Sequence, residues 1–233
     1  MINIGIIGAM DKEVEALLNK VEIERKDKIN DTLFYMCRYK KNELIVVKSG
    51  IGKVNSAVVT QLLISKYEPK YIINTGIAGA ISKKVKVLDI VIASETLQYD
   101  FDATNFGYKL GQIPQMDKYI FETNEYLIET MKKVLKKEQR YHVGRIISGD
   151  KFISKENDKK FLFKEFNGLC VDMESGSIGH VCYINGTSYI AIRCISDNAD
   201  ENSTENYNDF DSKAAYKSSE LILALLNKVL RSN

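Results

Sequence analysis

Apolar residues recur along the chain with two different spacings. In residues 123–137 the apolar side chains from Leu127 to Leu135 fall at i, i+1, i+4, i+7 and i+8, which places them on one face of a helix. Short unbroken apolar runs are typical of buried strands. The pattern predicts helices over residues 11–20, 53–66, 123–137, 173–182 and 210–230. It predicts strands over residues 2–7, 33–38, 44–48, 71–74, 87–93, 143–148 and 188–195.

Strands and helices alternate along most of the chain, which indicates an α/β layer structure with a mostly parallel central sheet. Residues 33–38 and 44–48 are an exception, because the Lys41–Asn42 turn between them predicts a hairpin. Gly (14) and Pro (2) are sparse and no linker composition occurs, so we expect one domain over residues 1–233. The longest irregular segment, residues 98–119, has a length typical of loops that cover a site or an interface.

The composition, with 45% apolar and 27% charged residues, is that of a globular protein with a full core. Lys and Arg (33) nearly balance Asp and Glu (31), giving a net charge of +2, which argues against a nucleic-acid binder that neutralises phosphates. His142 and His180 are the only histidines. We therefore expect carboxylates to do most of any chemistry.

The cysteines form no C-x-x-C pair, and each lies in or beside an apolar run. We interpret them as small buried hydrophobic residues and expect no metal site. The four are Cys37, Cys170, Cys182 and Cys194. The N-terminal ten residues are apolar but lack a basic region, and they are too short for a signal peptide or a membrane span. We therefore expect a cytoplasmic protein that does not associate with membranes.

Four glycine- or carboxylate-containing segments fall at predicted strand ends, where ligands bind in α/β sheets. They are residues 8–13, 49–53, 74–79 and 193–197. Each could be only a tight turn, but four together favour a binding site. Familiar motifs do not fit them. Residues 47–54 have valine at the first and last key positions of a phosphate-binding P-loop. Ser175 replaces the first glycine of a nucleophile elbow.

Three carboxylates stand out in apolar or glycine-rich surroundings. Glu13 lies in the first turn of a predicted helix, where it could complement the helix dipole or act as a base. Glu174 could be a helix-start acid or could grip a pair of ribose hydroxyls. Asp197 ends a buried strand, where it could cap a helix or act as a general acid whose pKa is raised by burial.

These residues and their neighbours resemble the 5′-methylthioadenosine/S-adenosylhomocysteine nucleosidases over nearly the whole chain, in order and at family spacing. The matching segments are IGIIGAM (4–10) with Glu13, KSGIGKV (48–54), INTG (73–76), FGY (106–108), GQIP (111–114), SGD (148–150) with Phe152 and Ile153, VDME (171–174) and RCISDNAD (193–200). The resemblance implies a nucleoside phosphorylase-like, single-domain three-layer sandwich with a mixed, mostly parallel central sheet flanked by helices. It also implies a homodimer that uses no cofactor.

The activity that the resemblance implies is hydrolysis of the N-glycosidic bond of 5′-methylthioadenosine, S-adenosylhomocysteine and 5′-deoxyadenosine, in methionine salvage and S-adenosylmethionine by-product recycling. Asp197, steadied by Ser196, would protonate N7 of the leaving adenine. Glu13, helped by Arg193, would orient and deprotonate the attacking water. Glu174 would hold the ribose 2′-hydroxyl.

The resemblance also implies which residues form the walls of the pocket. Phe152 would stack on adenine, and the backbone of Ile153 would read its Watson–Crick edge. Met173 would pack against the sugar, and Tyr207 would line the alkylthio pocket. Further substrate-binding residues would be Ala9, Ile51, Ala78 and Gly79. A second copy of the chain would contribute Ala103, Phe106 and Pro114.

Three departures from the family pattern leave the substrate ranking open. Ile77 stands where many members have a serine that helps to hold the water, Tyr207 adds a hydroxyl to an apolar wall, and Ala103 makes the partner-side wall small. Two other functions compete. A phosphorylase on the same fold would meet repulsion between phosphate and Glu13. A non-catalytic nucleoside sensor would not need Asp197 and Glu13 together.

Overall fold

The computed structural model describes residues 4–40, 42–135 and 139–229. Its α-helices are α1 (Asp11–Leu18), α2 (Lys53–Tyr67), α3 (Glu125–Val134), α4 (Glu156–Phe166), α5 (Ser175–Asn185) and α6 (Ser203–Val229). Its strands are β1 (Ile4–Gly8), β2 (Glu22–Ile29), β3 (Thr32–Tyr39), β4 (Asn42–Lys48), β5 (Tyr71–Ala80), β6 (Ile90–Gln98), β7 (Ile120–Glu122), β8 (Tyr141–Ser148), β9 (Cys170–Asp172) and β10 (Ser188–Asp197).

The strands form one mixed sheet in the order β10-β6-β8-β9-β5-β1-β4-β3-β2, with β7 beside β6. Parallel pairs join β1 to β4 and β5, β5 to β10, β6 to β8, and β8 to β9. Antiparallel pairs join β2 to β3, β3 to β4, β5 to β9, β6 to β7, and β6 to β10. Strand β10 pairs with both β5 and β6. A closed ring of five strands results, in the order β5, β9, β8, β6 and β10. The predicted class, an α/β fold with a mixed central sheet, is confirmed.

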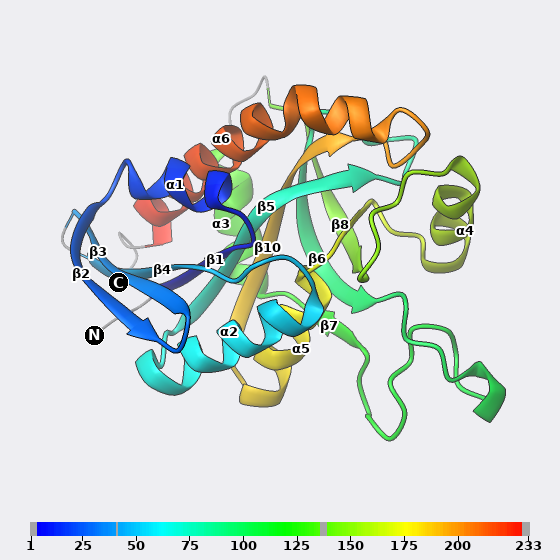
Figure 1. Ribbon diagram of the computed structural model, residues 1–233, viewed down its shortest axis with the longest axis horizontal. Helices are drawn as coiled ribbons and strands as arrows, with labels where there is room; N and C mark the ends of the chain where they lie inside the picture. Colours follow the sequence, from blue (N-terminus) through cyan, green and yellow to red (C-terminus); the bar gives the residue numbers. More distant parts are fainter. Residues whose placement is uncertain (1–3, 41, 136–138, 230–233) are drawn as a thin grey trace.

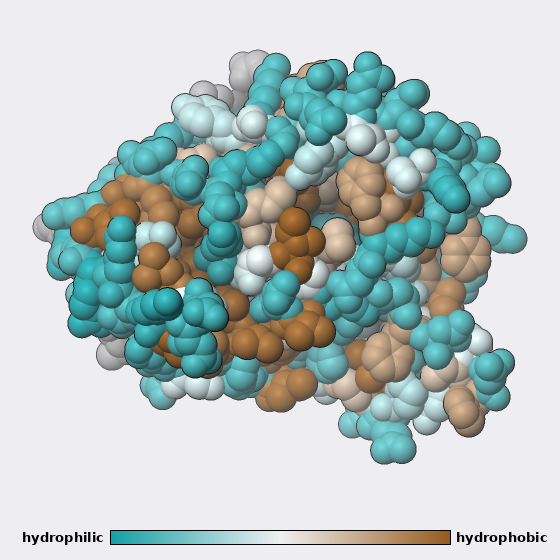
Figure 2. Space-filling model, in the orientation of Figure 1, coloured by the Kyte–Doolittle hydropathy of each residue, from teal (hydrophilic) through white to brown (hydrophobic). Residues whose placement is uncertain are grey.

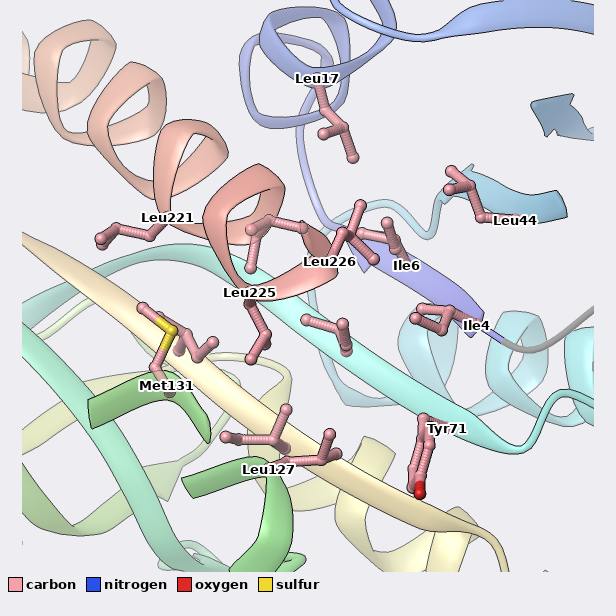
Figure 3. Close-up of a cluster of buried hydrophobic side chains, with 14 of the residues drawn as sticks. Ile4, Ile6, Leu17, Leu44, Tyr71, Leu127, Met131, Leu221, Leu225 and Leu226 are labelled. Carbon is pink, nitrogen blue, oxygen red and sulfur yellow. The ribbon is translucent and has the colours of Figure 1, made fainter. Parts of the chain in front are cut away.

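Helices cover both faces of the sheet, as Figure 1 shows, with α1, α3 and α6 on one face and α2 and α5 on the other. On the first face, side chains of β1, β5 and β10 meet the apolar stripes of the three helices (Figure 3). Leu127 and Met131, from the stripe that predicted α3, are fully buried in this cluster. The helix begins where the Asn124 side chain accepts a hydrogen bond from the Leu127 amide at 3.1 Å, an N-cap.

On the second face, α2 contributes Val59, Leu63 and Ile64 to a cluster that also contains Ile72 of β5 and Ile178 of α5. Strands β1, β4 and β9 lead into α1, α2 and α5, so the carboxyl end of each strand lies near the N-terminal end of the helix that follows it. The loops at these strand ends lie close together around one cavity although they are far apart in the sequence.

Most predicted elements are present, with shifted ends. The predicted hairpin is confirmed, with Tyr39 paired to Asn42 across β3 and β4. Parts of the predictions lie outside the described residues, namely positions 2 and 3, 41, 136 and 137, and 230. Three helix starts were wrong: α3 begins at Glu125 instead of residue 123, α5 begins at Ser175 instead of residue 173, and α6 begins at Ser203 instead of residue 210. Asn202, Ser203 and Thr204 are residue types that begin helices, and they mark the true start of α6.

The strand predicted over residues 71–74 continues through the glycine-containing segment that follows it. Residues 74–79, for which a tight turn was one of two interpretations, pair with β10 from Ala191 to Asp197 as part of β5. Elements β2, β7, α4 and β9 were not predicted. Strand β2 is rich in charged residues and pairs on one edge with β3, so its sequence carries no apolar signal.

Part of the segment 98–119 extends away from the body of the protein, at the lower right of Figure 1, whereas Tyr99 and Ile113 within it are buried. The segment contains only a single 3-10 turn, Thr104–Phe106, and the Phe106 side chain is 84% exposed. The predicted irregular loop is therefore present, and it carries an apolar side chain into solvent. None of the described helices is long and apolar enough to cross a membrane.

Candidate active site

A cavity of about 400 Å³ lies at the carboxyl ends of β1, β4, β5, β8, β9 and β10. This is the edge at which ligands bind in α/β sheets. Most of its wall is apolar, with a few carboxyl and hydroxyl groups. The lining residues are Ala9, Met10, Glu13, Ile51, Ile77, Ala78, Gly79, Lys151, Phe152, Ile153, Val171, Asp172, Met173, Glu174, Ser196, Asp197, Thr204, Tyr207 and Asn208.

Glu13 is held by backbone amides on both of its carboxylate oxygens. It sits at the third position of α1, and its Oε2 accepts from the amides of Ala9 at 2.7 Å and Met10 at 3.0 Å, as in a capping box. Its Oε1 accepts from the Ile77 amide of β5 at 3.1 Å. Burial raises the pKa of Glu13, while the charge of Arg193 and these amide bonds oppose the rise. The carboxylate is thus fixed in direction and more basic than a carboxylate in water.

Asp197 ends β10 and is 2% exposed. Its Oδ2 accepts from the Ser196 hydroxyl at 2.8 Å, and its Oδ1 accepts from the Ala199 amide at 2.8 Å. Burial raises the pKa of Asp197, and the two hydrogen bonds limit the rise because they favour the charged form. Asp197 does not cap α6, which begins six residues later. A carboxyl group in this state can carry a proton to a leaving group.

Glu174 lies between β9 and α5, where its Oε1 accepts from the Gly52 amide at 2.9 Å. Gly52 is the residue before α2, with a φ of 98°. Burial and the nearby charge of Asp172 raise the pKa of Glu174 to about 8. Within the part of the chain that the structure describes, no hydrogen bond is donated to the second oxygen, Oε2.

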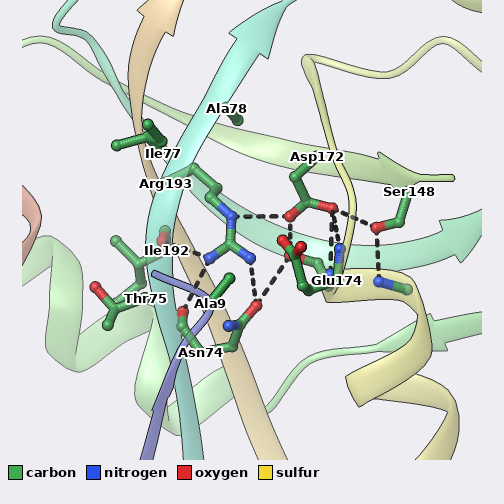
Figure 4. A network of polar contacts seen from close by, with 12 residues as sticks. Ala9, Asn74, Thr75, Ile77, Ala78, Ser148, Asp172, Glu174, Ile192 and Arg193 are labelled. Atoms are coloured by element: carbon green, nitrogen blue, oxygen red, sulfur yellow. Dashed lines mark hydrogen bonds and ion pairs between the residues drawn. The ribbon is translucent and has the colours of Figure 1, made fainter. Parts of the chain in front are cut away.

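Arg193 is buried behind the cavity wall, where it organises a polar network (Figure 4). Its Nε donates to Asp172 Oδ2 at 2.8 Å, and its Nη2 donates to Asn74 Oδ1 at 2.5 Å. Asp172 in turn accepts from the amides of Glu174 and Ser175 at 3.2 Å each. The network joins β5, β10 and the start of α5, so it fixes the backbone that presents Glu174.

The outer wall of the cavity is aromatic. The rings of Phe152 and Tyr207 meet edge to face, with centroids 5.9 Å apart. Phe152 is 44% exposed and lines the cavity, so its side chain is accessible to a ligand there. The Tyr207 hydroxyl lies 3.2 Å from the Met10 sulfur, to which it donates. A flat, largely apolar ligand with a few polar edges suits these surroundings.

The chain is similar to known proteins over nearly its whole length. The pattern of the Phosphorylase superfamily matches residues 3–227. The 5′-methylthioadenosine/S-adenosylhomocysteine nucleosidase of Staphylococcus aureus is 39% identical over 228 residues, which are 97% of this chain and 100% of that protein. The chain belongs to this nucleosidase family. The family predicted from the sequence motifs is therefore confirmed.

Solved structures agree with the nucleosidase assignment. The Helicobacter pylori 5′-methylthioadenosine/S-adenosylhomocysteine nucleosidase superposes with a TM-score of 0.93 at 31% identity, covering 97% of this chain and 98% of that one. A futalosine hydrolase of the same organism also superposes with a TM-score of 0.93, at 32% identity and 97% coverage of both chains. The fold thus carries hydrolases with more than one nucleoside substrate.

The nucleosidase cavity contains nearly all the residues that the sequence singled out. It brings together Ala9, Glu13, Ile51, Ala78, Gly79, Phe152, Ile153, Met173, Glu174, Ser196, Asp197 and Tyr207. Arg193 is not among its lining residues in the described part of the chain, since its guanidinium faces Asp172 and Asn74. The three residues expected from a second copy, Ala103, Phe106 and Pro114, likewise lie outside the cavity of their own chain.

Sequence reasoning missed several lining residues of the nucleosidase. Thr204 and Asn208 come from the first turns of α6, and Lys151 comes from the segment that follows β8. Asp172 was quoted in a motif but given no role. Its position in a buried stretch, two residues before Glu174, is the signal that could have identified it as a site residue. Among the described residues, no group of three or more His, Cys, Asp or Glu side chains could hold a metal ion.

Proposed function

We propose that this protein hydrolyses the N-glycosidic bond of 5′-methylthioadenosine and S-adenosylhomocysteine, releasing adenine and the thioribose product for methionine salvage. The observation that carries the proposal is the set of three buried carboxyl groups around one apolar cavity. Each of them, Glu13, Asp197 and Glu174, is oriented by backbone amides, and each has a pKa raised by burial. The reaction needs a general acid, a base and a group that binds the sugar. Asp197, Glu13 and Glu174 fill these three roles in that order.

Asp197 acts as the general acid in this proposal. Cleavage of an N-glycosidic bond leaves negative charge on the departing base, and protonation of adenine N7 removes that charge. The raised pKa keeps the proton on Asp197 closer to neutral pH than an ordinary aspartate would. Ser196 holds the carboxyl group through its 2.8 Å hydrogen bond.

Glu13 acts as the base that orients and deprotonates the attacking water. Its amide bonds to Ala9, Met10 and Ile77 hold the carboxylate against the cavity without a side-chain partner. The departure at residue 77 removes a side-chain hydroxyl but keeps this backbone hydrogen bond, because the Ile77 amide still contacts Glu13. Arg193 contributes through its charge and through the network that it organises, and not by direct contact in the cavity.

Glu174 binds the ribose 2′-hydroxyl through Oε2, since its Oε1 accepts from the Gly52 amide. Met173 packs against the sugar, Phe152 stacks on the adenine, and the backbone of Ile153 reads the edge of the base. The oxocarbenium-like transition state carries positive charge on the sugar, which the nearby Glu13 carboxylate stabilises electrostatically. Tyr207, at the outer wall, borders the 5′-substituent.

The same proposal includes a homodimer, in which each copy completes the pocket of the other. Apolar side chains gather over α2 along the lower edge of Figure 2. Val54 is 73% exposed, and Ile51, Val58 and Ile184 are also exposed. Exposed apolar patches of this kind mark interaction surfaces. The 98–119 loop would carry Ala103, Phe106 and Pro114 from one copy to the cavity of its partner.

We further propose that residues 1–233 form a single domain that works in the cytoplasm. One sheet with its two helical layers accounts for the described residues. Cys37, Cys170, Cys182 and Cys194 are all buried free thiols, which suits a reducing compartment.

The decisive experiment measures adenine release from 5′-methylthioadenosine in phosphate-free buffer. Turnover under these conditions is the expected result, because water is the nucleophile in the proposal. Turnover that required phosphate would establish a phosphorylase instead, and binding without adenine release would establish a sensor. Comparing 5′-methylthioadenosine, S-adenosylhomocysteine, 5′-deoxyadenosine and futalosine at one enzyme concentration then ranks the substrates.

A further inference from the structure

Three charged residues from distant parts of the chain meet beside the cavity, at the start of α2. The Lys53 amide donates to Asp150 Oδ1 at 2.8 Å. The Asp150 amide donates to Asp100 Oδ2 at 3.0 Å. The Lys53 ammonium closes the triangle by donating to Asp100 Oδ1 at 2.5 Å. The triangle thus joins three loops, which follow β4, β6 and β8.

The same helix end also holds a residue of the proposed active site. The amide of Gly52 donates to Glu174, and the next amide, of Lys53, donates to Asp150. Gly52 adopts a φ of 98°, and a Cβ at this position would lie 3.1 Å from Asp150 Oδ1. The first amides of a helix have no acceptor within the helix. At the start of α2 two adjacent amides therefore donate to two side-chain carboxyl groups, one inside the cavity and one beside it.

Asp150 lies immediately before the segment that forms the outer cavity wall. Lys151, Phe152 and Ile153 all line the cavity. Lys151 and Phe152 are exposed, so packing against the core fixes only Ile153. The hydrogen bonds that Asp150 makes through its amide and its carboxylate therefore help to hold this segment in place.

We propose that Asp150, anchored by Asp100 and Lys53, is a positioning residue for the nucleobase half of the active site. It holds residues 151–153 at a set distance from α2, and α2 holds Glu174 in the sugar half through Gly52. The triangle thereby sets the spacing between the surface that binds the base and the carboxylate that binds the ribose. This inference rests on the proposed function, because it assigns residues 151–153 to the adenine.

The test compares inhibition by the two products, adenine and methylthioribose, in Asp150→Ala and the wild-type enzyme. In the variant we expect the inhibition constant of adenine to rise by about tenfold or more, as for a displaced binding group, and that of methylthioribose to stay nearly unchanged. Asp150→Asn should recover most of the affinity for adenine, because an amide oxygen can still accept from the Lys53 amide. Asp158→Ala is the matched control, since Asp158 pairs with Lys151 on the outer side of the same segment.

A purely structural role for Asp150 would weaken both inhibitors alike and lower the melting temperature, and that result would overturn the proposal. An unchanged inhibition constant for adenine would overturn it as well. If Asp150→Ala does not fold, Asp100→Ala removes the acceptor of the Asp150 amide, and the same split between adenine and methylthioribose is expected. Failure of the wild-type enzyme to release adenine would instead refute the proposed function, so the two failures are distinguishable.

Discussion

Gly79 on β5 and Asp197 on β10 are paired neighbours in the sheet, and a Cβ on Gly79 would lie 2.7 Å from Asp197 Oδ1. Gly76, three residues earlier on the same strand, makes a similar close approach to Glu13 of α1, whose Oε1 would lie 2.6 Å from a Cβ on Gly76. One strand therefore approaches both proposed catalytic carboxyl groups at positions that only glycine can occupy without displacing them.

Replacing either glycine with alanine should displace the carboxyl group beside it. For Gly79→Ala and Gly76→Ala we expect kcat/KM to fall by about 100-fold, as misplacement of a catalytic group by about 1 Å can do. The loss of stability from overpacking should be about 1–3 kcal/mol. Steady-state kinetics and denaturant unfolding measure the two effects.

Gly144→Ala provides the control, because its Cβ would meet the Leu169 side chain at an equally short 2.7 Å. Leu169 does not line the cavity in the described part of the chain, so this variant should lose stability and keep its kcat/KM. Similar kinetic losses in all three variants would show that the glycines serve packing alone.

Asp197→Asn should abolish most adenine release while leaving substrate binding nearly intact. The amide keeps the shape of the side chain but cannot donate the proton, and general acid catalysis contributes about 10²–10⁴-fold in rate. Single-turnover kinetics and calorimetric titration with 5′-methylthioadenosine measure the two quantities. Asp31→Asn makes the same charge change at an exposed position between β2 and β3, outside the cavity lining that the structure describes, and should have little effect.

The value of kcat/KM should fall at high pH, as Asp197 loses its proton, and at low pH, as Glu13 gains one. Ser196→Ala should move the alkaline limb to higher pH, because the Ser196 hydroxyl stabilises the charged form of Asp197 and so lowers its pKa. Ser219→Ala removes another buried hydroxyl, which bonds to the Tyr216 carbonyl oxygen, and should leave the limb in place. A limb that stayed fixed in Ser196→Ala would assign the alkaline transition to a different group.

Glu174 should make the protein less stable as the pH rises. Its pKa is near 8 in the folded protein and is lower when unfolded, so the folded state binds more protons between about pH 4.5 and 8. The cost of burying its charge is absent below this window and complete above it. Glu174→Gln should therefore raise the melting temperature at pH 9 by a few degrees, given that about 1 kcal/mol shifts Tm by roughly 2–4 °C in a domain of this size.

At pH 4 the Glu174→Gln and wild-type proteins should melt at nearly the same temperature. Glu165→Gln, at an exposed position on α4, should show no difference at either pH. Calorimetric scans across this range give the comparison. A gain in stability of Glu174→Gln that did not depend on pH would place its cause in packing and not in proton binding.

Val54→Asp should prevent dimer formation, because it puts a charge into the apolar patch over α2. A monomer would lack the pocket residues that the partner supplies, so kcat/KM should fall together with the dimer fraction. Sedimentation and kinetics on the same sample follow both. Tyr216→Asp changes an exposed position on α6, across the sheet, and should stay dimeric and active. A fully active Val54→Asp monomer would contradict the shared pocket.

The sequence alone determined the alternation of strands and helices, because apolar spacing is a local property of each element. The stripe containing Leu127 and Met131 is buried as its periodicity predicted. Local spacing also placed Glu13, Glu174 and Asp197 at the carboxyl ends of strands, where ligands bind in α/β sheets. The motifs around these residues named the family.

Only the tertiary structure decided which side chains face the cavity. Arg193 shares a motif with Asp197 but turns away to Asp172 and Asn74, which are distant in sequence. The glycines of β5 continue the strand because β10 pairs with them, a contact that no local pattern encodes. The triangle around Asp150 likewise depends on three loops that meet after folding. The type of each element follows from local periodicity, so the sequence determined it. The direction of each side chain follows from long-range packing, so only the tertiary structure determined it.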